Sequence, residues 1–150
     1  MFAKPATWVV APHMPPNRRP PTDRLTVLIV DDDFDARHMY SEFLRLHGWL
    51  AFTAADGRAG IDKAMELLPS AIVLDLAMPR VDGWTALEQL RESSWTSAIP
   101  IVVVSAVDAR DRAFEAGCDA FLTKPCNPET LWLQIRALLR LQTSGRTVRV

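Results

Sequence analysis

The chain has 150 residues, of which 49% are hydrophobic and 23% are charged, and its formal net charge is −1 at pH 7. This length fits one domain with an ordinary hydrophobic core, and the apolar content excludes a chain that is disordered throughout. The sequence has no apolar run close to the ~20 residues that cross a bilayer, so we expect no membrane insertion and a cytoplasmic protein.

The first 24 residues differ in composition from the rest of the chain. They hold six of the eleven prolines and lack the apolar stretch and cleavage site of a signal peptide, so we predict a proline-rich, disordered tail at 1–24. Residues 25–145 carry eleven basic and seventeen acidic side chains, a net charge of −6 that argues against direct DNA binding. The two cysteines are too few for a disulfide scaffold and fit a reducing compartment.

Strand and helix patterns alternate from Leu25 onward. The predicted strands are mostly short apolar runs, at 25–30, 49–54, 71–74, 101–104 and 120–123. The predicted helices have apolar residues three and four apart, at 35–47, 57–68, 83–92, 108–116 and 128–141. Asn127 is expected to cap the last helix. The folded domain is therefore predicted at 25–141, followed by a short polar tail at 142–150.

Five alternations of strand and helix predict a parallel sheet with helices on both faces and right-handed crossovers. In such sheets, functional sites form beyond the carboxyl ends of the strands. Four separate strands deliver polar side chains to that edge, namely Asp31, Asp32, Asp75, Ser105 and Lys124. This convergence is stronger evidence for a site than any one motif.

The acidic side chains at this edge suit a hard divalent cation. Asp31 and Asp32 repel each other unless a cation lies between them, and Mg²⁺ or Mn²⁺ prefers such oxygen ligands. Asp75 offers a further ligand or a nucleophile that forms an aspartyl phosphate. The backbone carbonyl of Ala77 is a candidate for one more metal position. No organic cofactor is indicated.

Two other side chains at the same edge suit phosphoryl transfer. That reaction needs mainly positioning and charge neutralisation, which the ammonium group of Lys124 provides together with a metal ion. The hydroxyl of Ser105 offers a hydrogen bond to a phosphoryl oxygen.

At these positions the sequence resembles the receiver domain of bacterial two-component response regulators. The resemblance covers roughly residues 25–141. It implies a flavodoxin-like (βα)5 fold, with five parallel strands in the order 2-1-3-4-5 and helices on both faces. The segments that carry the resemblance are 27–33 (VLIVDDD), 75–83 (DLAMPRVDG), 101–106 (IVVVSA), 115–121 (EAGCDAF) and 122–125 (LTKP).

The resemblance implies a role for each of these residues. Asp75 would accept a phosphoryl group from a histidine kinase or histidine phosphotransfer protein. Asp31 and Asp32 match the magnesium-binding pair, and Ser105 and Lys124 match the residues that contact the phosphoryl group. The protein would then be a phosphorelay component and no enzyme, since it catalyses only its own phosphorylation and dephosphorylation. A cis bond between Lys124 and Pro125 is also expected.

The resemblance further implies a switch. Phosphorylation of Asp75 would draw Ser105 toward the phosphoryl group, and Phe121, the switch aromatic, would turn into the vacated space. The face formed by the fourth helix, fifth strand and fifth helix would then change shape. No helix-turn-helix or catalytic effector pattern follows residue 141, so we expect a single-domain regulator that acts on an unknown downstream protein.

The sequence departs from the family pattern in one spacing and at two single positions. Lys124 lies 19 positions after Ser105, three fewer than the family pattern, so we expect an altered fourth loop or helix and an altered output face. Ala77 and Val107 stand at positions that influence hydrolysis of the phosphoryl group. Neither side chain can orient a water molecule, so we expect slow self-dephosphorylation.

Two alternatives stay open at this point. A haloacid-dehalogenase-like phosphatase would use Asp31 and Asp33 as its acidic pair, although that class needs a longer chain and a residue other than Asp35 two positions further on. A degenerate receiver would serve only as a binding module, although all the key acids and the lysine are present. Magnesium-dependent labelling of Asp75 by a small phosphodonor separates the three cases.

Overall fold

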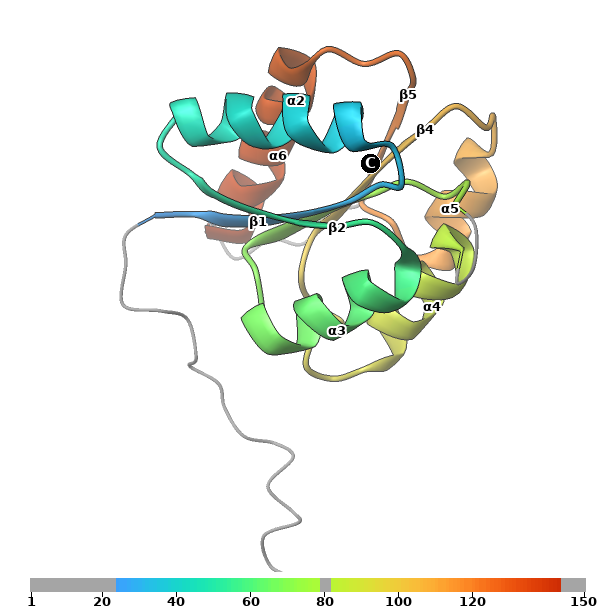
Figure 1. Ribbon diagram of the computed structural model, residues 1–150. Coiled ribbons are helices and arrows are strands. Elements are labelled where there is room, and N and C mark those ends of the chain that lie inside the picture. The colour runs from blue at the N-terminus through green and yellow to red at the C-terminus, as the bar shows by residue number, and fades with distance from the viewer. Residues whose placement is uncertain (1–23, 79–81, 144–150) are drawn as a thin grey trace, which may run out of the picture.

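A computed structural model describes residues 24–78 and 82–143 as a parallel sheet between two helical layers (Figure 1). The sheet order is β2-β1-β3-β4-β5, which confirms the predicted flavodoxin-like order 2-1-3-4-5. The strands are β1 (Thr26–Val30), β2 (Leu50–Ala54), β3 (Ala71–Leu74), β4 (Ile101–Ser105) and β5 (Ala120–Thr123). The helices are α2 (Phe34–Leu46), α3 (Gly57–Leu67), α4 (Gly83–Glu92), α5 (Arg110–Ala116) and α6 (Pro128–Thr143).

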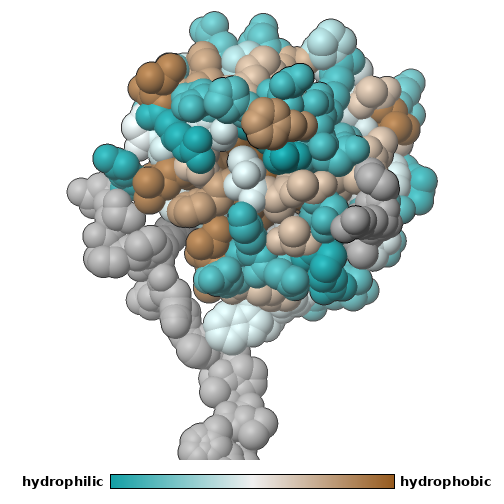
Figure 2. All heavy atoms as spheres, viewed as in Figure 1, coloured by the Kyte–Doolittle hydropathy of each residue, from teal (hydrophilic) through white to brown (hydrophobic). Residues whose placement is uncertain are grey.

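The central strand β1 is buried on both faces. Val27 and Ile29 belong to the core on the side of α2 and α6, whereas Leu28 and Val30 belong to the core on the side of α3, α4 and α5. Alternate residues of a strand point to opposite faces, so a continuous apolar run fills both cores. Hydrophilic residues spread over the face that Figure 2 shows, between smaller apolar patches. Burial of β1 thus fixes the strand that carries the first acidic residues.

The predicted element boundaries agree with the structure to within two residues. The largest difference at a helix start is α5, which begins at Arg110 and whose N-cap residue, Ala109, has no side chain that can accept a hydrogen bond. The last helix continues to Thr143, so residues 142 and 143 of the predicted polar tail are helical. The predicted proline-rich tail lies outside the described residues except for Arg24, as do residues 144–150.

Aspartate and asparagine side chains start four of the five helices. Each accepts a hydrogen bond from a backbone N–H two or three residues further on, at 2.8–3.1 Å. Carboxylates at these positions also interact favourably with the helix dipole. The four capping residues are Asp33, Asp56, Asp82 and, as predicted, Asn127.

The edge strand β2 is protected by two cationic side chains. Leu50 donates its N–H to the carbonyl of Leu25, which precedes β1. Because backbone groups alternate along a strand, the carbonyls of residues 51 and 53 point away from β1. Arg45 of α2 donates to the carbonyl of Ala51 at 2.7 Å, and Lys63 of α3 donates to that of Thr53 at 2.5 Å. Occupied carbonyls and charged side chains disfavour pairing with another chain. None of the helices within the described residues is long and apolar enough to span a membrane.

A buried ion pair ties α4 to the amino ends of β4 and β5. Arg91 donates to Asp119 at 2.6 Å and also to the carbonyls of Gly117 and Ile99. The same carboxylate oxygen of Asp119 accepts the N–H of Ile101 at 2.9 Å. The two side chains are only 12% and 10% exposed, so solvent screens their attraction weakly.

We expect the Asp119→Ala substitution to lower the free energy of unfolding by about 3 kcal/mol, because it leaves the buried charge of Arg91 without its carboxylate. Urea denaturation monitored by circular dichroism measures this change. The matched control is Asp62→Ala, which breaks an exposed 3.6 Å pair with Arg58 and should cost less than about 0.5 kcal/mol. Equal effects of the two substitutions would contradict the assignment of Asp119 as a structural anchor.

Candidate functional site

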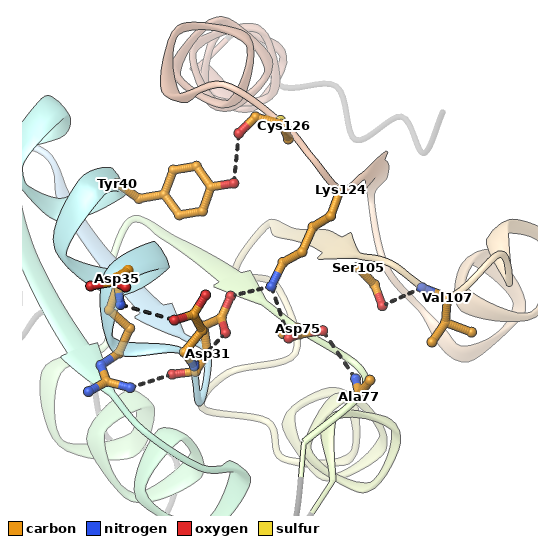
Figure 3. Close-up of polar contacts among 11 residues, drawn as sticks. Asp31, Asp35, Tyr40, Asp75, Ala77, Ser105, Val107, Lys124 and Cys126 are labelled. Atoms are coloured by element: carbon orange, nitrogen blue, oxygen red, sulfur yellow. Dashed lines mark hydrogen bonds and ion pairs between the residues drawn. The ribbon is translucent and has the colours of Figure 1, made fainter.

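The residues that were predicted to form a site lie at the carboxyl edge of the sheet. Asp31 follows β1, Asp75 follows β3, Ser105 ends β4 and Lys124 follows β5. Parallel strands place their carboxyl ends at the same edge, and the order of the sheet reverses between β1 and β3. Figure 3 shows Lys124 pointing between Asp31 and Asp75.

The ammonium group of Lys124 contacts two of the three acidic residues. Its Nζ lies 2.8 Å from Oδ2 of Asp31 and 3.2 Å from Oδ2 of Asp75. Asp31, Asp32 and Asp75 each offer an oxygen, and these three oxygens lie within 4.8 Å of one another. The structure thus brings together four of the predicted site residues.

Backbone N–H groups orient the two buried carboxylates. Oδ1 of Asp31 accepts the N–H of Asp33 at 2.9 Å, and Oδ1 of Asp75 accepts that of Ala77 at 3.1 Å (Figure 3). Each carboxylate therefore has one oxygen held by the backbone and the other directed at Lys124. Asp32 is exposed, so the cluster opens to solvent on its side.

Gly83 supports this arrangement in a way that the sequence analysis did not identify. A Cβ atom at this position would lie 2.0 Å from the carbonyl oxygen of Asp75 and 2.4 Å from Cα of Leu76. The N–H of Gly83 donates to the carbonyl of Leu76 at 3.1 Å. Only glycine allows the start of α4 to pack this closely on the end of β3. The signal was present as Asp-Gly between a strand and a helix, but the contact itself depends on the folded chain.

Ser105 and Phe121 are both buried in this structure. The hydroxyl of Ser105 accepts the N–H of Val107 at 3.2 Å, and Phe121 packs in the core on the side of α3, α4 and α5. The inward position expected for Phe121 is therefore already present, and movement between two positions stays a prediction. The exposed Arg110 donates to the carbonyl of Phe121 at 3.2 Å.

The segment after Lys124 is fixed to α2. The peptide bond between Lys124 and Pro125 is cis, as predicted. Tyr40 donates its hydroxyl proton to the carbonyl of Cys126 at 2.8 Å. Burial, followed by the negative charge of nearby groups, raises the pKa of Tyr40 to about 12, so this phenol stays a donor at neutral pH.

The charges in the site are only partly compensated. Burial raises the pKa of Asp75, the charge of Asp31 adds to this effect, and the N–H of Ala77 and the ammonium of Lys124 oppose it. Burial acts to lower the pKa of Lys124, but its hydrogen bond and ion pair with Asp31, together with those to Asp75, outweigh burial and raise that pKa. Lys124 is therefore protonated at neutral pH, and its ammonium group pairs with two of the three carboxylates.

This donor set fits a magnesium ion. All three candidate ligands are carboxylates, which hard cations prefer, and the exposed Asp32 leaves room for the water ligands that Mg²⁺ retains. A divalent ion bound by Asp31, Asp32 and Asp75 would balance the charge that Lys124 alone leaves uncompensated. The backbone carbonyl of Ala77 as a further ligand stays a prediction.

Comparison with known proteins gives a consistent match. The family model described as "Response regulator receiver domain" matches residues 27–136. The DNA-binding dual master transcriptional regulator RpaA of Synechocystis sp. is 37% identical over 117 residues, which are 76% of this chain and 48% of that protein. The transcriptional regulatory protein PrrA of Mycobacterium tuberculosis is 40% identical over 124 residues, 81% and 52% of the two chains. The chain thus spans about half the length of these curated relatives.

Solved structures match over nearly their whole length. The chemotaxis protein CheY4 of Vibrio cholerae has a TM-score of 0.72 and 31% identity, and the match covers 76% of this chain and 98% of that one. A putative response regulator from Chloroflexus aurantiacus also has a TM-score of 0.72 and 31% identity, with coverage of 78% and 98%. These matches support the assignment of the sheet order.

We expect Asp75→Asn to raise the urea midpoint at pH 7 in the presence of EDTA. The folded chain holds the proton of Asp75 more tightly than the unfolded chain, so this group's contribution to stability is lost as pH rises through its folded pKa. The difference from wild type should shrink as pH falls toward 3.8, the ordinary pKa of this carboxyl. Urea titrations between pH 4 and pH 8 measure it, with the exposed Asp62→Asn as control. A lower midpoint for Asp75→Asn at pH 7 would contradict the prediction.

Proposed function

The chain belongs to the response regulator receiver domain family, and we propose that Asp75 accepts a phosphoryl group from a histidine kinase or histidine phosphotransfer protein in a magnesium-dependent reaction. The observation that carries this proposal is the position of Lys124, whose ammonium lies between the carboxylates of Asp31 and Asp75. It places a fixed positive charge beside the carboxylate that would attack phosphorus.

The reaction replaces one bond to phosphorus by another. A carboxylate oxygen of Asp75 forms a P–O bond, the P–N bond of the donor phosphohistidine breaks, and its electron pair stays on the imidazole nitrogen, which takes a proton from solvent. Lys124 stays protonated and neutralises negative charge on the transferred group. A magnesium ion, when bound by Asp31, Asp32 and Asp75, supplies further charge neutralisation. Ser105 would donate a hydrogen bond to the phosphoryl group after a local rearrangement.

A groove next to the site offers a docking surface for the donor protein. It has a volume of about 440 Å³ and is formed by α2 and the segment after β5. Met39, which is 42% exposed, contributes apolar surface to it, and Asp33 and Lys124 connect it to the acidic cluster. We propose that the donor contacts this groove while its phosphohistidine approaches Asp75.

We propose that the receiver, at 25–141, signals through protein contacts with a downstream target and does not itself bind DNA. Its acidic character supports this proposal. The activity of the longer relatives does not transfer to this chain, since the match covers about half of their length. The family assignment disfavours the haloacid-dehalogenase-like phosphatase. A degenerate receiver would not be labelled in the experiment below, which separates it from the proposed phosphoacceptor. The receiver would catalyse only its own phosphorylation and dephosphorylation.

We expect acetyl phosphate and Mg²⁺ to add one phosphoryl group to the full chain, as measured by intact-protein mass spectrometry. Asp75→Asn should abolish the label, EDTA should prevent it, and Lys124→Met should slow it by about 10²-fold because the fixed charge is lost. The control Asp62→Asn, on an exposed face of α3, should be labelled like wild type. Turnover of many equivalents would indicate a phosphatase, and failure to label would indicate a binding module; either result contradicts the proposal.

The structure also supports slow self-dephosphorylation. Ala77 and Val107 are exposed, and their N–H groups donate to Asp75 and Ser105, so both flank the site with side chains that cannot hydrogen-bond to water. We expect Ala77→Asn to shorten the lifetime of phosphorylated Asp75 several-fold, because an amide can orient the attacking water. Release of radiolabelled phosphate measures the lifetime. Ala98→Asn, at the opposite edge of the sheet, should leave the lifetime unchanged, and an unchanged lifetime in Ala77→Asn would disprove the idea.

A further inference from the structure

We propose that Arg37 is a positioning residue for the acidic cluster: it fixes the peptide bond between Asp31 and Asp32 and thereby strengthens binding of a divalent cation. This inference rests on the proposed function, in which the cluster is a magnesium site. Arg37 lies in the first turns of α2, six residues after Asp31, and is half-buried.

The contact that carries the inference is a hydrogen bond from a charged side chain to the backbone. Nη1 of Arg37 donates to the carbonyl oxygen of Asp31 at 2.8 Å. Hydrogen bonds with an ionised donor are shorter and stronger than those between neutral groups. This carbonyl belongs to the peptide unit that joins Asp31 to Asp32, so the guanidinium group holds the plane from which Asp32 projects.

Arg37 completes the set of contacts that immobilise Asp31. The N–H of Asp31 donates to the carbonyl of Ala54 at 3.1 Å, and its two carboxylate oxygens accept from Asp33 and Lys124. With Arg37 on the carbonyl, each polar atom of Asp31 has a partner. Asp32 is exposed, and the direction of its side chain therefore depends on the backbone that carries it. Residues outside the metal ligands that orient them commonly change metal affinity about 10- to 100-fold when substituted.

The exposed side chain of Phe34 supports Arg37 from outside. Phe34 is 65% exposed. The guanidinium carbon of Arg37 lies 5.6 Å from the centroid of the Phe34 ring. The ring of His38 stacks on that of Phe34 with a centroid distance of 6.0 Å and an interplanar angle of 4°. Arginine stacks favourably on aromatic faces, so Phe34 restrains the guanidinium in its position over the carbonyl.

If Arg37 acts only through its charge, its loss should change Mg²⁺ affinity in the opposite direction from that expected if it positions the peptide bond between Asp31 and Asp32. A nearby positive charge repels a divalent cation, so loss of Arg37 through charge alone would strengthen Mg²⁺ binding. Loss of a fixed peptide plane would weaken it. The sign of the change in the dissociation constant therefore distinguishes a positioning residue from a bystander charge.

The test is a titration of the full chain with Mg²⁺ by isothermal titration calorimetry. We expect Arg37→Met to raise the dissociation constant about tenfold. We expect Arg37→Lys, which retains a charged donor but not the planar fork, to give an intermediate value. The matched control is Arg58→Met, which removes the same charge from an exposed position on α3 and should change the constant less than about twofold. An unchanged or lower constant in Arg37→Met overturns the inference.

A second measurement uses the chain without metal. Because the hydrogen bond from Arg37 polarises the peptide unit of Asp31 and Asp32, Arg37→Met should shift the backbone amide ¹⁵N resonance of Asp32, whereas Arg58→Met should not. An unshifted resonance would overturn the inference. Urea midpoints of the variants verify that each variant is folded. If Arg37→Met does not fold, both measurements are made with Arg37→Lys.

The outcomes separate this inference from the function on which it rests. If the wild-type chain is labelled on Asp75 and binds Mg²⁺, and Arg37→Met binds Mg²⁺ equally well, only the role of Arg37 is overturned. Wild-type chain that binds no Mg²⁺ and is not labelled overturns both.

Discussion

The ammonium group of Lys124, held between the carboxylates of Asp31 and Asp75, is the interaction on which the rest of the site depends. Lys124 lies 93 positions after Asp31 and 49 positions after Asp75 in the sequence. The three residues meet only because β1, β3 and β5 end at one edge of the sheet. The ammonium group of Lys124 does not by itself neutralise the three carboxylates of Asp31, Asp32 and Asp75. Burial, to which the charge of Asp31 adds, raises the pKa of Asp75, and the repulsion among these carboxylates favours the uptake of a divalent ion.

The stability of the fold comes from elsewhere in the molecule. The strand β1 fills two hydrophobic cores, and the opposite edge of the sheet holds another buried carboxylate, Asp119. Asp119 has the guanidinium of Arg91 and a backbone N–H as donors to its buried carboxylate. The two edges thus differ in how completely their acids are compensated. Asp119 and Arg91 tie the elements at one edge together, whereas the carboxylates at the acidic edge keep negative charge that a bound cation would compensate.

The sequence was sufficient to predict the fold and the position of the site, because both depend on short-range patterns. Apolar runs and helical spacing placed the elements, and the polar residues at the strand ends had to converge once the strands were parallel. Contacts that depend on tertiary distances could not be predicted. The fit of Gly83 against the carbonyl of Asp75 and the bond from Arg37 to the carbonyl of Asp31 are of this kind. The burial of Phe121 depends likewise on the packing of three helices.

The short segment between β4 and β5 need not prevent communication between the site and the surface of the domain. Lys124 donates its backbone N–H to the carbonyl of Ser105 at 3.0 Å. Lys124, which contacts Asp75, is therefore also hydrogen-bonded to β4, the strand that carries the Ser105 hydroxyl. Three residues earlier, Phe121 contributes its ring to the core and its carbonyl to Arg110, which also lies over the ring of Phe114 on α5. These contacts connect Asp75, through Lys124, to two adjacent strands and to a seven-residue helix anchored to one of them. Because these contacts are made by the strands and by Arg110, they do not require the longer fourth helix that the family pattern leads one to expect.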